Sequence, residues 1–424
     1  MQKKLIALAV AGLASAGAFA QSNVTIYGVA DASFESVKAD SAASAKPQSD
    51  NPNVGSRTRL NTNSSLLGFK GSEDLGNGLK ALFQFESTVD LANSTPATAG
   101  YTQAPSAVGA GTGGVFGAKR DTFVALSGNF GTVLGGYVST PYRSIVTGFD
   151  VVPGSAGSGS DNGVFGKAIG AVNLVFRTNA IAYASPSFNG FSGVIAYVPN
   201  GAKSVDNLGN QVPSANPNGW NLGLNYANGG LKLAYSYLKL TDVGIGDKAI
   251  NNVTGLDSSK EDHKANLLAA SYDFGQGTTL VGMYQHYKGT VDLLNAGAGV
   301  GSFDINRNSY FLGLKHVLGA HEFAVSYQHA SDAGGNLLSN KALLGTNSDT
   351  GATQWTLRYG YNFSKRTQVY ALYTRIDNKD NANFNFANGA VGSAANTGDK
   401  ADLGTGVGAG SNPTVYGVGI RHSF

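Results

Sequence analysis

Pro413-Thr-Val-Tyr-Gly-Val-Gly-Ile-Arg-His-Ser-Phe424 is the stretch of sequence that decides the fold. With a period of two, one face takes Thr414, Tyr416, Val418, Ile420, His422 and Phe424, and the other takes Val415, Gly417, Gly419, Arg421 and Ser423. This alternation predicts a β-strand with one apolar or aromatic face and one small or polar face. An exposed edge strand invites aggregation, so the strand needs a partner. Val24 to Glu35, at the other end of the folded chain, is the natural candidate, and this pairing would close the sheet on itself.

The first twenty residues are expected to be a secretory signal peptide. Lys3 and Lys4 precede an apolar run, and Ala18-Phe19-Ala20 supplies the small residues of a cleavage site. The apolar run is too short to span a membrane comfortably. We therefore expect residues 1–20 to be removed and residues 21–424 to form one β-barrel domain, because no linker interrupts the pattern of turns and strands.

Composition narrows the class of protein. The 424 residues include 59 Gly, 19 Tyr and 21 Phe but no Cys, and 13% are charged. The nearly balanced 30 Lys and Arg against 27 Asp and Glu do not indicate a nucleic-acid partner. Without disulfides, we expect a closed hydrogen-bond ladder and subunit contacts, rather than an apolar interior, to stabilise the exported chain. No run of 18 apolar residues follows the leader, but the alternating strands of a membrane barrel would escape a hydropathy window.

Turn signals divide the rest of the chain into 16 expected strands. Seven tight turns, such as Asp74-Leu-Gly-Asn-Gly78, alternate with eight long segments rich in Gly, Ala, Ser, Asn and Asp. The clearest strand alternates Trp355, Leu357, Tyr359, Tyr361 and Phe363 with Thr356, Arg358, Gly360 and Asn362.

The strict alternation of short and long connections is typical of a barrel with short periplasmic turns and long extracellular loops. Lipid does not tolerate an open sheet edge, so the sheet must close, and a barrel of this size has a wet lumen. We expect an all-β fold, a 16-stranded antiparallel transmembrane β-barrel. β-Propellers, β-helices and secreted sandwiches are the alternatives.

Six stretches spread over the chain carry a family resemblance: Val24-Thr-Ile-Tyr-Gly28 with Asp31, Leu67 to Ala81, Phe123 to Val133, Ser185 to Gly193, Ser364-Lys-Arg-Thr367 and Tyr416 to Phe424. At these residues the chain resembles the general bacterial porins of the Neisseria, Bordetella and Burkholderia type. The resemblance implies a homotrimeric, 16-stranded barrel in the outer membrane, with its third long loop, here residues 140–170, folded into the pore. The implied partners are outer-membrane lipid, lipopolysaccharide, small ions and solutes, and the barrel-assembly machinery, which would meet the strand that ends in Phe424.

One departure from the family pattern concerns a basic residue. Many relatives carry Arg-Gln after the Val-Thr-Leu-Gly stretch, whereas this chain has Gly136-Tyr137. A basic group expected near the constriction is missing, so the ion selectivity of relatives does not transfer directly.

A pore needs a wet lumen, a narrowing and charges that bias which ions enter. Arg57 and Arg59 are two apart and share a face, and the alternation of their strands places Lys70, Lys80, Glu86 and Arg358 inward. Arg143 and Asp150 lie on the expected constriction loop, and Arg120 and Arg177 begin strands beside long loops. We expect these ten residues to line the pore, although any one of them could be a solvated rim charge. Arginine dominates the set, and its planar, permanently charged head suits anions, so we expect a weak to moderate anion preference.

Other functions have weaker support. The six His show no metal-ligand spacing, and no Ser and His pair indicates an outer-membrane lipase. Gly109-Ala-Gly-Thr-Gly-Gly114 matches a dinucleotide motif but has no strand and helix around it. We expect no catalytic residues, metal or cofactor, and passive diffusion of small hydrophilic solutes. The alternatives are a solute-selective channel on the same fold and an adhesive barrel with negligible conductance.

Overall fold

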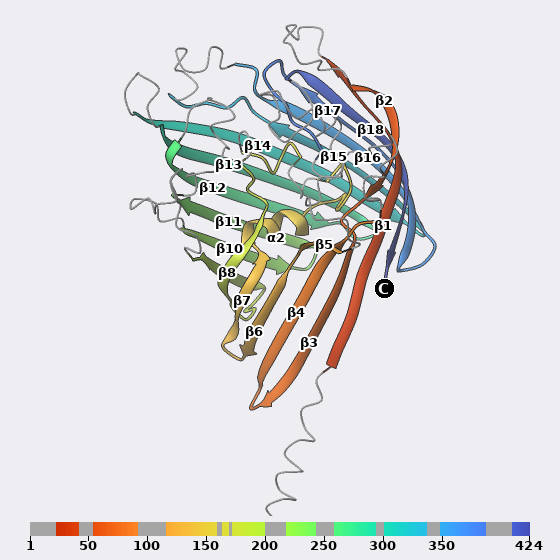
Figure 1. Ribbon diagram of the computed structural model, residues 1–424. Helices are drawn as coiled ribbons and strands as arrows, with labels where there is room; N and C mark the ends of the chain where they lie inside the picture. Colours follow the sequence, from red (N-terminus) through yellow and green to blue (C-terminus); the bar gives the residue numbers. More distant parts are fainter. Residues whose placement is uncertain are drawn as a thin grey trace, which may run out of the picture.

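The computed structural model describes residues 23–41, 54–91, 116–158, 163–168, 172–199, 218–242, 258–293, 301–336, 348–386 and 409–424. They form one antiparallel sheet of strand segments that closes into a barrel (Figure 1). Closure rests on β1 (Asn23–Ser41) and β18 (Ser411–Ser423), which pair from Val29 opposite Ser423 to Ser41 opposite Ser411. The predicted pairing of the two ends of the barrel domain is confirmed.

The remaining segments follow in chain order: β2 (Val54–Thr62), β3 (Leu66–Gly76), β4 (Leu79–Val89), β5 (Phe116–Lys119), β6 (Thr122–Gly128), β7 (Gly131–Ser139), β8 (Arg177–Ala184), β9 (Phe191–Val198), β10 (Asn218–Asn228), β11 (Leu231–Thr241), β12 (Ser258–Asp273), β13 (Thr278–Leu293), β14 (Gly301–Leu318), β15 (His321–Ala330), β16 (Ala352–Asn362) and β17 (Thr367–Asn378). β2 and β3 both pair with β1, and β5 and β6 both pair with β4, so each of these pairs is one interrupted strand. Counted this way, the 18 segments make the predicted 16-stranded barrel.

Turn chemistry explains the short connections. Asn77 (φ 51°) and Gly78 (φ 77°) join β3 to β4, the left-handed conformation that a two-residue hairpin turn requires. Some expected boundaries are wrong. β1 runs on to Ser41, so the segment expected at 36–56 is shorter, and β8 begins at Arg177 rather than near 171. Residues 172–176 belong instead to the loop, whose side chains pack inside the barrel.

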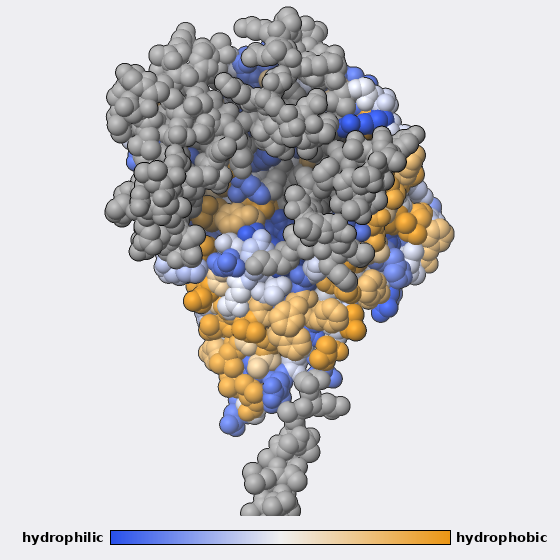
Figure 2. Space-filling model, in the orientation of Figure 1, coloured by the Kyte–Doolittle hydropathy of each residue, from blue (hydrophilic) through white to orange (hydrophobic). Residues whose placement is uncertain are grey.

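The two faces of each strand differ as the sequence pattern predicts. In β16, Trp355 and Leu357 are 49% and 52% exposed, whereas Gln354 and Thr356 are fully buried. The final strand repeats this, with Tyr416 exposed and Val415 buried. Figure 2 shows the apolar residues gathered on the outside of the barrel toward the end with the short turns. Among the described residues, no helix is long and apolar enough to cross a membrane.

Candidate functional site

The connection between β7 and β8 turns into the barrel (Figure 1). It opens with α2 (Pro141–Gly148), where Thr140 Oγ1 accepts a hydrogen bond from the Arg143 amide at 3.2 Å and Pro141 occupies the first turn. We call residues 140–176, as far as they are described, the inner loop. The family resemblance implies an inward fold for residues 140–170, and the buried side chains described on the loop pack inside the barrel.

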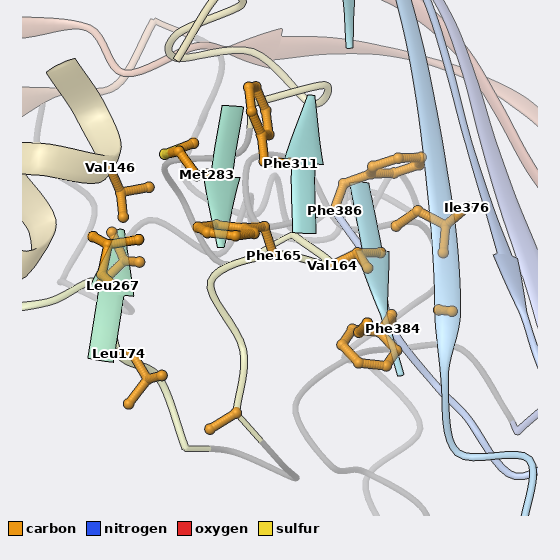
Figure 3. Close-up of a cluster of buried hydrophobic side chains, with 14 of the residues drawn as sticks. Val146, Val164, Phe165, Leu174, Leu267, Met283, Phe311, Ile376, Phe384 and Phe386 are labelled. Carbon is orange, nitrogen blue, oxygen red and sulfur yellow. The ribbon is translucent and has the colours of Figure 1, made fainter. Parts of the chain in front are cut away.

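The inner loop packs against one side of the lumen through apolar side chains. In Figure 3, Phe165 of the loop lies beside Met283 of β13, and its ring centroid is 6.1 Å from that of Phe311 of β14. Val146 of α2 and Leu174 belong to the same cluster and are fully buried. Burial of one such side chain contributes about 1.5–3 kcal/mol. The expectation that an apolar interior contributes little to stability is therefore wrong for this half of the lumen.

A row of amide side chains fixes the main chain of the inner loop. Gln285 Oε1 of β13 accepts from the Tyr142 hydroxyl at 2.8 Å, and Gln328 Oε1 of β15 accepts from the Phe165 amide at 3.1 Å. Both glutamines are fully buried. The loop therefore forms a fixed wall of the channel.

Arg307 of β14 provides the charged anchor. Its Nη1 donates to the Ala168 carbonyl at 2.9 Å and its Nη2 donates to the Thr350 carbonyl at 2.8 Å, while the guanidinium lies 5.1 Å from the centroid of the Phe384 ring. Arg307 is 4% exposed. One side chain thus joins the inner loop to the segments that follow β15 and β17.

The inner face of the barrel from β15 through β18 and β1 to β4 carries ion pairs. Their shortest N···O distances are 2.7 Å for Arg59 and Glu35, 2.9 Å for Arg421 and Asp31, 3.4 Å for Arg120 and Glu86, and 2.9 Å for Arg358 and Glu322. Asp31 also accepts from the Tyr370 hydroxyl at 2.8 Å. Each of these four acids has a basic partner, so the pairs leave no uncompensated negative charge.

Three further cations face the bore and form no ion pair among the described residues. Arg57 shares the inward face of β2 with Arg59, Lys70 Nζ lies 5.0 Å from the centroid of the inward Tyr27 ring, and Lys80 follows the inward parity of β4. All three side chains are exposed although they point into the barrel. This part of the bore is therefore open to water. Asp74 lies opposite Lys80 on the same inward face and offsets its charge, whereas Arg57 and Lys70 leave an excess of positive charge.

Local contacts hold three other predicted site residues. Arg143 is 8% exposed, and its Nη1 donates to the Val175 carbonyl at 3.2 Å. Asp150 is half-buried, and its Oδ2 accepts from Ser158 Oγ at 2.5 Å. Arg177 shares the face of the outward Ile181, and its Nε lies 3.3 Å from Asp121 Oδ2. Arg143 and Arg177 have structural contacts of their own, and their role in lining the pore stays a prediction.

Sequence reasoning missed the residues that hold the inner loop. Arg307 follows the same inward parity that identified Arg358, so its alternation with Ile305 and Ser309 was an available signal. The buried glutamines gave no signal, because nothing in the local sequence distinguishes an amide that binds a loop from one that faces water. Glu261 and His263, 3.3 Å apart and buried on the inward face of β12, were also missed. Within the described residues, no group of three or more His, Cys, Asp or Glu could hold a metal ion.

The backbone explains the missing basic residue at position 136. A Cβ on Gly136 would lie 2.2 Å from the Thr122 carbonyl oxygen and 2.6 Å from Phe123 Cα, whereas a Cβ on Gly135 would meet nothing within 4 Å. Any side chain at Gly136 would therefore push against the backbone of β6. A basic group cannot be restored there without moving a strand.

We expect Gly136→Ala to destabilise the barrel by about 1–3 kcal/mol, because overpacking forces the backbone to shift. Gly135→Ala, one residue away on the open side, should be neutral within about 0.5 kcal/mol. Thermal unfolding followed by circular dichroism measures both. Equal midpoints for the two variants would contradict the close packing of β6 and β7.

Comparison with known proteins places the barrel in a family. The family model described as Gram-negative porin matches residues 7–381. The chain belongs to the Gram-negative porin family. Outer membrane porin protein 32 of Delftia acidovorans is 31% identical over the full length of both chains (100% of each), and an outer membrane porin of Bordetella pertussis is 28% identical, again over 100% of each. Major outer membrane protein P.IB of Neisseria gonorrhoeae is 32% identical over 238 residues, which cover 56% of this chain and 57% of that protein.

A solved structure agrees with the family assignment. The anion-selective porin from Comamonas acidovorans superposes with a TM-score of 0.66 at 28% identity, and the match covers 95% of this chain and 100% of that one. The porin described here is therefore an outer-membrane barrel that forms a water-filled channel for small hydrophilic solutes. Its family is one of channels rather than enzymes.

Proposed function

We propose that this porin is a passive channel with a weak to moderate preference for small anions and no enzymatic activity. The observation that carries the proposal is the charge balance of the bore. Four acids are paired with arginines, while Arg57, Lys70 and Lys80 form no ion pair among the described residues and only Lys80 has an acid, Asp74, opposite it in the sheet. Charges that line a narrowing bias which ions enter. The porin from Comamonas acidovorans, which is described as anion-selective, supports the same preference for anions over cations.

The inner loop supports this preference because it offers little opposing charge. Its side chains that reach the bore include Ser144 and Pro153, both exposed and uncharged. Asp150, the acid described on this loop, accepts hydrogen bonds from the Val152 amide and the Ser158 hydroxyl. The charged residues described on the loop are Arg143, Lys167 and Asp150, so the loop adds no net negative charge to the bore.

The proposal extends to assembly and export. We infer a homotrimer, since one solved barrel of the same fold is described as a trimer form. We also infer a signal peptide over residues 1–20, which lie outside the described residues. Residues 21–424 then form the single barrel domain. The outward apolar side chains would be shared between lipid and neighbouring subunits.

The test is the reversal potential of the purified protein in a planar bilayer across a potassium chloride gradient. The proposal expects a potential with the sign of chloride permeation. A potential of the cation sign would overturn it. A current that saturates with one solute would favour the solute-selective channel, and negligible conductance would favour the adhesive barrel.

A further inference from the structure

The outer face of the barrel has a hollow between β14 and β17. We call it the β14–β17 groove; its volume is about 490 Å³, and it is lined by outward side chains that include Leu314, Phe323, Leu357, Tyr359, Ala371 and Tyr373. Leu357 and Phe323 are 52% and 47% exposed. Ala371 is the smallest of these side chains and leaves the hollow between its larger neighbours. The groove lies in the surface that meets lipid, so an apolar chain is its natural filling.

A row of ring side chains leads from the groove to the short-turn end of the barrel; we call these residues, Phe323, Tyr359, His321, Tyr361 and Phe363, the aromatic step. The rings of Phe323 and Tyr359 are 5.3 Å apart, His321 lies 5.3 Å from Tyr361, and Tyr361 lies 5.2 Å from Phe363. Aromatic residues of this kind form the girdle at the level of lipid headgroups. The groove is therefore at acyl-chain depth in the periplasmic leaflet.

Two cations stand beyond this step, in the turn between β16 and β17. Lys365 and Arg366 are both exposed, and neither pairs with an acid in the described part of the chain. Glu322, the acid on the neighbouring β15, faces inward and is held by Arg358 at 2.9 Å. The carboxylate of Phe424 lies near this turn, since the Ser423 amide donates to the Arg366 carbonyl at 2.8 Å, but it forms no ion pair with either cation in the described part of the chain. Two cations against one carboxylate leave the outer rim at this turn positively charged toward the headgroups.

We propose that an anionic glycerophospholipid of the periplasmic leaflet binds here, with an acyl chain in the β14–β17 groove and its phosphate at Lys365 and Arg366. Tyr359 is four residues from Phe363, a distance of about 14 Å along the strand. The tilt of the strands shortens this along the membrane normal, and both cationic side chains are long. The glycerol backbone spans the interval at the height of the aromatic step.

A second groove on the same barrel lacks the charged rim. It has a volume of about 1330 Å³ and is lined by residues of β9 to β15 that include Phe191, Ala270 and Tyr310. The turns at its periplasmic end, residues 186–190, 229–230 and 274–277, contain no Lys or Arg. Apolar shape is therefore common to both grooves, whereas the cations distinguish the β14–β17 groove.

The experiment is native mass spectrometry of the delipidated full-length porin, titrated separately with phosphatidylglycerol and phosphatidylcholine. Each cation near an anionic lipid is worth about a fivefold change in affinity. We expect phosphatidylglycerol to bind about 25-fold more tightly than phosphatidylcholine, and Lys365→Gln with Arg366→Gln to remove that difference. Ala371→Phe fills the groove and should weaken both lipids, while Ala270→Phe fills the other groove and should leave the preference intact.

Several results would overturn the site. Equal affinity for the two lipids in the natural protein would remove the role of the cations. Unchanged phosphatidylglycerol binding in Ala371→Phe, or a loss confined to Ala270→Phe, would place the lipid elsewhere. Dissociation of the oligomer by Ala371→Phe would show that a second copy covers the groove. Channel conductance, measured on the same variants, reports separately on the bore.

Discussion

Neutralising Arg57, Lys70 and Lys80 together, as Arg57→Gln, Lys70→Gln and Lys80→Gln, should abolish most of the anion preference. A unit charge about 7 Å from a permeating ion in water contributes about 0.6 kcal/mol, which favours an anion and disfavours a cation to the same degree. Salt weakens this interaction, because the Debye length at 0.1 M is about 10 Å. We expect the anion-to-cation permeability ratio to fall on the order of fivefold. The reversal potential across a salt gradient measures this ratio.

The matched control removes a positive charge outside the bore. Lys288 of β13 lies on the outward face, where its Nζ is 3.2 Å from Asp304 Oδ2. Lys288→Gln should leave the reversal potential unchanged. A triple variant with the selectivity of the natural protein would show that the selectivity arises elsewhere.

Replacing Arg307 with Met should widen the channel. The guanidinium makes two charge-assisted hydrogen bonds to the carbonyls of Ala168 and Thr350, each worth about 1.5–3 kcal/mol. Met fills the space of the side chain but makes neither bond, so the inner loop loses its charged anchor and samples positions away from the wall. We expect the single-channel conductance to rise by about twofold or less, because the apolar cluster still holds Phe165. The current should also become noisier.

The control for this variant is Arg366→Met, which removes an arginine from the short turn outside the bore. It should leave single-channel conductance unchanged. Arg307→Met must also show the natural β-sheet circular dichroism, so that loop release is separated from misfolding. A folded Arg307→Met barrel with natural conductance would contradict the anchoring role of Arg307.

The fold could be predicted from the sequence because its signals are local and repeated. A period of two fixes which side of each strand meets lipid, and Asn-Gly turns such as Asn77 and Gly78 fix the register of the hairpins. The break between β2 and β3 at Ser64, where φ is 51°, could not be predicted. A bulge of this kind depends on the contacts that a strand makes with its neighbours.

The site was only partly predictable. The alternation of side chains along the strands identified Lys70 and Lys80 as inward and put Arg57 on one face with Arg59, but it says nothing about distances across the lumen. The ion pairs between Arg59 and Glu35 and between Arg120 and Glu86 join residues 24 and 34 positions apart, and they depend on strand register. The packing of the inner loop depends on apolar contacts between residues more than a hundred positions apart, which no local pattern carries.

The most direct measurement compares two neighbouring residues of β3 as single cysteines, since the natural chain has none. Lys70 faces the wet bore, and Phe69, 40% exposed, faces lipid. A charged, membrane-impermeant thiol reagent should react quickly with Lys70→Cys and change the single-channel current, while Phe69→Cys in a bilayer should stay unmodified with unchanged current. Equal reaction at both positions would contradict a closed barrel with a wet interior and a lipid-facing exterior.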